Sequence, residues 1–202
     1  MYKKLQKALW GLMTMVALTG LTSCDEDTQM SWTLSGQWFG DFGMFYDYED
    51  RLGQVTTYYS TESDIYFEPN SSFSTRGVGW QRDYYRYGPY KYMYYKFYWH
   101  VRDGVLYLEY PYDRQLDTYI YDYRLRNGHF VGRLGDSHTG FDLVKVDIYD
   151  DWSYYLGERD YYYYYYDEYP LYAPSRSAGE EPQPEGRIVR RGNRWNSVNG
   201  EK

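Results

Sequence analysis

Cysteine occurs once in the 202 residues, at position 24, and alanine is absent between Asp25 and Tyr172. A single cysteine excludes an intramolecular disulfide, so the core alone has to hold the fold. Alanine is the strongest helix former, and helix-length amphipathic patterns are also missing. These two absences exclude a helical domain and the α/β classes built on a parallel sheet. The sequence therefore predicts an all-β protein.

The motifs of common catalytic sites are missing as well. His100, His129 and His138 are scattered and belong to no HExxH or Cys/His cluster, so we expect no metal and no cofactor. No serine lies in a Gly-x-Ser-x-Gly motif. Carboxylate pairs such as Asp150–Asp151 could serve a glycosidase in principle, but nothing distinguishes them from solvated charge. We expect a protein that is not an enzyme, and the alternative is an enzyme with an unrecognised active site.

Tyrosine, in contrast, occurs 31 times, and the aromatic residues alternate with polar ones as strands require. Residues 95–102 alternate in this way, Asp103-Gly104 suits a tight hairpin turn, and residues 106–110 alternate again. Asn127-Gly128 predicts a second hairpin. From Leu34 to Val146 we expect about eight to ten short strands, which favours an antiparallel barrel or a sandwich.

The N-terminus has the layout of a cleaved signal peptide. Lys3, Lys4 and Lys7 precede an apolar run over residues 8–20, which is shorter than the about 20 residues of a bilayer span. Leu21-Thr22-Ser23-Cys24 resembles the lipobox of bacterial lipoproteins. This resemblance implies cleavage after residue 23 and acylation of Cys24, which then anchors residues 24–202 to a membrane. An uncleaved anchor helix is the alternative.

Asp25, Glu26 and Asp27 follow the cysteine directly. Such an acidic run resembles the surface-export signal of some Gram-negative lipoproteins, which implies a lipid-anchored protein on the outer membrane, displayed at the cell surface. In other Gram-negative groups an Asp after the cysteine implies retention at the periplasmic face of the inner membrane. A flexible acidic tether over residues 24–31 is the plain interpretation. Without the three lysines of residues 1–23 the net charge falls from −7 to about −10, which argues against nucleic acid as a partner.

Residues 32–147 carry a second resemblance. The opening segment Gly36-Gln37-Trp38, followed by Phe67-Glu68-Pro69-Asn70, residues 97–99, 104–108, 130–132 and 141–143, is similar to the small lipocalin-like domains of Gram-negative lipoproteins. The resemblance implies an antiparallel up-and-down barrel of about eight strands, in which Trp38 closes one end of the core. Such a barrel leaves room for side chains or one small ligand.

The sequence after the barrel changes in character twice. Residues 148–172 include six consecutive tyrosines, Tyr161 to Tyr166, and we expect an arm that packs on the barrel wall. Residues 173–202 are rich in Pro, Gly and Arg, a composition that predicts a disordered tail. The mildly cationic tail either folds back on the acidic body or docks on an acidic partner.

Tyrosines crowd the segment from Trp80 to Tyr95 around a predicted turn at Gly88-Pro89. Cross-strand aromatic pairing explains part of this density. The alternative is a recognition surface for a glycan, a peptide or a protein partner, with Trp80, Tyr84, Tyr85 and Tyr87 as candidate contacts. The sequence thus predicts a non-catalytic binding or adaptor lipoprotein, which acts through this surface or through the barrel mouth.

Overall fold

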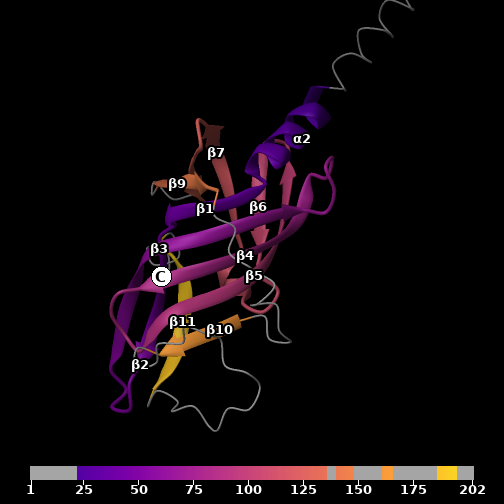
Figure 1. Ribbon diagram of the computed structural model, residues 1–202. Helices are drawn as coiled ribbons and strands as arrows, with labels where there is room; N and C mark the ends of the chain where they lie inside the picture. Colours follow the sequence, from indigo (N-terminus) through magenta and orange to yellow (C-terminus); the bar gives the residue numbers. More distant parts are fainter. Residues whose placement is uncertain (1–21, 136–139, 148–160, 166–185, 195–202) are drawn as a thin grey trace, which may run out of the picture.

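A computed structural model describes residues 22–135, 140–147, 161–165 and 186–194 of the chain. Eight antiparallel strands close into a barrel, because β1 pairs with β9 on one side and with β3 on the other (Figure 1). The fold is an all-β, lipocalin-like barrel of eight strands, and the prediction of fold class is confirmed. The strands are β1 (Gly36–Asp41), β3 (Val55–Pro69), β4 (Arg76–Tyr85), β5 (Tyr90–Arg102), β6 (Val105–Glu109), β7 (Thr118–Arg126), β8 (His129–Leu134) and β9 (Gly140–Val146).

The two predicted hairpins are confirmed. Asp103 and Gly104 join β5 to β6, and Asn127 and Gly128 join β7 to β8; all four residues have positive φ angles between 53° and 75°. A hairpin turn whose two central residues both have positive φ angles has a twist that matches the twist of the flanking strands. The Asn-Gly and Asp-Gly dipeptides therefore set the register of both strand pairs.

Three strands extend the sheet beyond the barrel. Residues 63–67 of β3 pair with β1, whereas residues 55–59 pair with β2 (Met44–Glu49), which in turn pairs with β11 (Arg187–Asn193). Strand β5 similarly pairs with β6 near its end and with β10 (Tyr161–Tyr165) near its start. Figure 1 shows these additional strands in the lower part of the view, at the ends of the long strands β3 and β5 with which β2 and β10 pair.

Large aromatic side chains fill the barrel interior. Trp38 is buried as predicted, meets Phe130 edge to face at a centroid distance of 5.6 Å, and donates a hydrogen bond from Nε1 to the Leu34 carbonyl at 2.7 Å. Phe67 contacts Phe97 at 5.4 Å in the same geometry. Gly79 faces Phe97, and a Cβ at this position would lie 2.1 Å from the ring. The core is therefore packed ring against ring.

A helix precedes the barrel, which corrects the prediction of a flexible acidic tether over residues 24–31. Helix α2 (Thr22–Leu34) docks on the barrel because its side chains find partners there. The Asp27 carboxylate accepts hydrogen bonds from the backbone amides of Asp103 at 3.0 Å and Gly104 at 2.9 Å. Leu34 is fully buried in the core. The barrel therefore opens with β1 at Gly36, after the helix.

The prediction of a disordered tail over residues 173–202 is wrong for Arg187–Asn193, which form β11. This strand pairs with β2, and its arginines meet carboxylates of the acidic body: Arg190 Nε lies 2.6 Å from Asp47 and Arg187 Nε 2.7 Å from Glu49. Charge complementarity thus favours the folded-back alternative for this segment. The rest of the predicted tail lies outside the described residues.

Of the predicted arm over residues 148–172, the structure describes Tyr161–Tyr165, which pair with β5 as strand β10. A short 3-10 helix, η1 (Arg114–Leu116), connects β6 to β7. None of the helices in the described part of the chain combines the length and hydropathy that crossing a bilayer requires.

Candidate functional site

Strand β4 places the predicted contact residues on two opposite faces. Side chains alternate along a strand, so Tyr84 faces outward and Tyr85 faces the core. Tyr85 is 3% exposed and its ring lies 4.8 Å from that of Tyr46. Trp80 faces outward but is 8% exposed, because it stacks on Tyr66 at 5.8 Å and packs beside Tyr94. Of the four candidate contact residues, Trp80 and Tyr85 are therefore buried and do not belong to an exposed recognition surface.

Tyr84 forms one wall of an open pocket, which we call the Tyr84 pocket. Its ring meets that of Tyr92 edge to face at 5.2 Å, and the cavity has a volume of about 410 Å³. Charged side chains of both signs, Glu62, Arg86 and Lys91, line it as well. Tyr87 follows Arg86 in the β4–β5 turn and is 70% exposed. Sequence reasoning thus located the region of this pocket and one of its walls.

Asp64 and Arg82 fix the position of the Tyr84 side chain. Its hydroxyl donates a hydrogen bond to the Asp64 carboxylate at 2.6 Å, and Asp64 also forms an ion pair with Arg82. The Arg82 guanidinium lies 5.1 Å from the centre of the Tyr84 ring. Burial, and then the hydrogen bond to Asp64, raise the pKa of the Tyr84 hydroxyl well above its ordinary value. The pocket wall is therefore a neutral, preorganised ring face.

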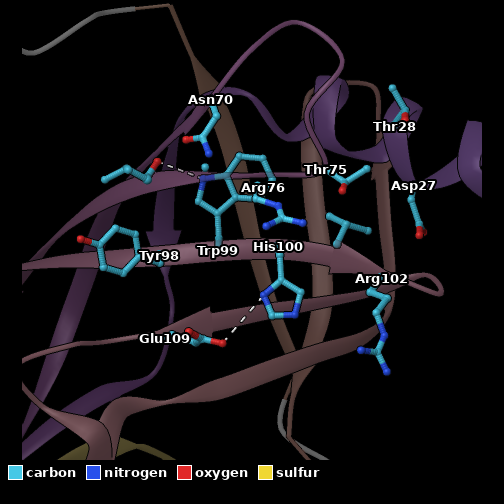
Figure 2. Close-up of a pocket in the computed structure, with 13 residues that line it drawn as sticks. Asp27, Thr28, Asn70, Thr75, Arg76, Tyr98, Trp99, His100, Arg102 and Glu109 are labelled. Atoms are coloured by element: carbon cyan, nitrogen blue, oxygen red, sulfur yellow. Dashed lines mark hydrogen bonds and ion pairs between the residues drawn. The ribbon is translucent and has the colours of Figure 1, made fainter.

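A second and larger depression lies on the outer face of β4, β5 and β6, and we call it the Arg76 groove (Figure 2). Its volume is about 770 Å³, and helix α2 contributes Asp27 and Thr28 to its wall. Figure 2 shows the Arg76 side chain between Asn70 and His100. His100 stacks on Tyr107 with a centroid distance of 4.6 Å, and its Nδ1 atom lies 3.9 Å from Glu109. Sequence reasoning missed this groove; the signal was the run of outward residues Tyr98, His100 and Arg102.

The barrel interior holds a buried polar network, centred on Asp83 and Gln81. Asp83 on β4 accepts hydrogen bonds from the Ser63 hydroxyl at 2.6 Å and from Gln81 Nε2 at 2.9 Å. The Tyr110 hydroxyl donates to Gln81 at 2.6 Å. Burial raises the pKa of the Asp83 carboxyl to about 7, although the hydrogen bonds from Ser63 and Gln81 act in the opposite direction.

Among the described residues, His, Cys, Asp and Glu side chains form no group of three or more that could hold a metal ion. His129 and Asp142 form a pair at 2.8 Å, but both are exposed on the barrel surface. His138 lies outside the described residues. The two depressions with convergent aromatic and charged side chains remain the candidate sites.

The predicted lipidation and sorting residues lie in one helical segment. The backbone of Cys24, Asp25 and Glu26 belongs to α2, and Asp27 is engaged with the β5–β6 turn. Comparison with known proteins found no family model, no curated protein and no solved structure that matches this chain.

Proposed function

We propose that the protein is a lipoprotein of the cell envelope, anchored through acyl chains on Cys24 and displayed at the surface of the outer membrane. The lipobox-like Leu21-Thr22-Ser23-Cys24 and the acidic residues after it support this location. Several acyl chains anchor a protein stably, because each buried CH₂ contributes about 0.8 kcal/mol. If the host reads Asp25 as a retention signal, the same protein stands on the periplasmic face of the inner membrane.

In this location the protein acts as a non-catalytic binding module, and the Tyr84 pocket is its recognition site. The observation that carries this proposal is the pair of rings, Tyr84 and Tyr92, set edge to face beside side chains of both charges. Rigid aromatic faces provide contact area at low cost in conformational entropy. The charged rim then orients a polar ligand. These features suit a glycan or a peptide segment of a protein partner.

Because the barrel interior is filled, we favour a site on the outer surface and not one in the barrel mouth. Trp38, Phe67 and Phe97 are each at most 1% exposed and occupy the space that a lipocalin-type ligand would need. Removing one such ring to admit a ligand would cost about 3 to 5 kcal/mol in lost packing. The Tyr84 pocket, in contrast, is open without rearrangement.

Binding to arrays of glycans and peptides tests the proposal. We expect Tyr92→Ser, which removes one wall of the pocket, to weaken binding of the array ligand at least about tenfold, equivalent to 1.4 kcal/mol. The matched control is Tyr98→Ser, because Tyr98 also faces outward on β5 but lines the Arg76 groove. Equal affinities of wild type and Tyr92→Ser would refute the Tyr84 pocket as the recognition site.

A further inference from the structure

Helix α2 holds the Arg76 groove close to the proposed lipid anchor. Asp27, in the groove wall, follows Cys24 by three residues in the same helix, and each helical residue adds about 1.5 Å. The distance along the helix axis from Cys24 to the groove wall is therefore about 5 Å. An acylated Cys24 would bring the groove to the surface of the bilayer.

Several contacts fix this orientation. The Asp27 carboxylate holds the β5–β6 turn through two backbone amides. Further along the helix, the Ser31 hydroxyl donates to the Ser74 carbonyl at 2.5 Å, and Lys145 Nζ donates to the Thr33 carbonyl at 3.1 Å. The barrel is thus joined to the helix that carries Cys24, and the groove stays close to that residue.

The groove is lined by two arginines, Arg76 and Arg102, and two carboxylates, Asp27 and Glu109. Arg102 pairs with Asp103, and Asp27 is engaged with two backbone amides. Arg76 is exposed, and its guanidinium has no hydrogen-bond or ion-pair partner among the residues that the structure describes. Asn70 and Thr75 lie beside it as further donors (Figure 2). Glu109 lies on the other side of His100, and the Tyr98 ring, which is 47% exposed, comes from the position on β5 that pairs with Glu109 on β6 (Figure 2). A guanidinium with nearby neutral donors suits a phosphate, whereas a carboxylate with an aromatic face suits an ammonium group.

We propose that the Arg76 groove binds the headgroup of a zwitterionic phospholipid, a phosphate joined by a short linker to a primary ammonium, in the membrane that holds Cys24. This inference rests on the lipid anchor of the proposed function. Arg76 contacts the phosphate oxygens, and Glu109 with the Tyr98 ring receives the ammonium. The balance of charges in the groove favours a zwitterion over an anionic headgroup, since the chain from Cys24 onward carries a net charge of about −10 and repels anionic surfaces.

Calorimetric titration of the full chain in non-ionic detergent tests the chemistry of the groove. We expect glycerophosphoethanolamine to bind more tightly than glycerophosphoglycerol or inorganic phosphate. Arg76→Gln and Glu109→Gln should each weaken this binding at least tenfold. Arg133→Gln, an exposed arginine on β8, three strands from β5, is the matched control and should leave binding unchanged. Equal binding of inorganic phosphate, or no effect of Arg76→Gln, would overturn the proposal.

Reconstitution of the full chain into lipid nanodiscs identifies the source of the headgroup. In discs that contain phosphatidylethanolamine, the membrane lipid should occupy the groove and block soluble glycerophosphoethanolamine. In discs of phosphatidylglycerol alone, the soluble headgroup should still bind. Equal binding in both discs would overturn the membrane source and assign the groove to a free ligand. The detergent titration does not depend on acylation, so a missing lipid on Cys24 and a groove that fails to bind give different results.

Discussion

Asp83 makes the stability of the barrel depend on pH, in the direction opposite to that of an ion-paired carboxylate. It is 0% exposed, and burial raises the pKa of its carboxyl from 3.8 to about 7. Below pH 4 the carboxyl is protonated in the folded and unfolded chains alike. Between pH 4 and 7 the unfolded chain releases the proton while the folded chain retains it. Ionisation therefore lowers the free energy of the unfolded state, and the free energy of unfolding falls as the pH rises. Above pH 7 both states are ionised and this contribution is constant.

The expected size of the effect follows from the shift in pKa. About three pH units at 1.36 kcal/mol each give a loss of about 4 kcal/mol in the free energy of unfolding between pH 4 and pH 8. Asp83→Asn removes the titrating group but keeps an oxygen that accepts hydrogen bonds from Ser63 and Gln81. Relative to the wild type, the variant should therefore gain about 4 kcal/mol over this range.

Urea unfolding of the wild type and Asp83→Asn at intervals from pH 4 to pH 8 measures this difference. Other titrating groups affect both proteins equally and cancel. Ser63→Ala is the companion variant: it removes a hydrogen bond at 2.6 Å that favours the charged form, so its loss of stability should continue above pH 7. If the free energies of the wild type and Asp83→Asn remain parallel across the range, Asp83 is not a buried titrating group.

Three further predictions concern the core, the tail and sorting. Gly79→Ala should destabilise the barrel by about 3 kcal/mol or more in urea unfolding, because the added Cβ would lie 2.1 Å from the Phe97 ring. In the control Gly104→Ala the added Cβ meets no atom within 4 Å, and the free energy of unfolding should fall by about 1 kcal/mol. Equal losses in the two variants would contradict the packing described. Arg190→Ala should lower stability by about 1 to 3 kcal/mol in thermal unfolding, since it leaves the buried Asp47 carboxylate without its ion pair; an unchanged midpoint would show that this ion pair contributes nothing. Replacement of Asp25 and Glu26 by Ala, with Asp27 kept because it holds the β5–β6 turn, should protect the protein from protease added to intact cells; unchanged cleavage would exclude a sorting role.

Local patterns in the sequence were sufficient to predict an antiparallel barrel or sandwich, and the resemblance to lipocalin-like domains selected the barrel. The Asp103-Gly104 and Asn127-Gly128 dipeptides specify turns with positive φ, and alternation on either side specifies which face is buried. The same alternation, applied to Tyr84 and Tyr85, could have shown that two neighbouring tyrosines on one strand cannot both face the solvent. Tyrosine density alone did not reveal this, because a phenol ring suits both a core and a surface.

Features that depend on distant partners could not be predicted from composition. The acidic residues after Cys24 suggest a solvated tether, but Asp27 finds two backbone amides 76 and 77 residues away. The arginines of residues 187–194 suggest disorder, but Arg190 finds Asp47 across 143 residues of sequence. The Arg76 groove likewise combines residues from α2, the β3–β4 loop and three strands. Each of these contacts joins segments that are distant in the sequence and exists only in the folded protein.

The mass of the protein extracted from cell membranes tests the central claim, that Cys24 is the lipid anchor. Intact and peptide mass spectrometry should find a chain that begins at residue 24, with the cysteine carrying a diacylglyceryl group and an acylated amino group. Cys24→Ser should lack these additions and leave the membrane fraction. A membrane-bound chain that still begins at Met1, or one whose Cys24 is unmodified, would contradict the anchor and the placement of the barrel at the bilayer surface.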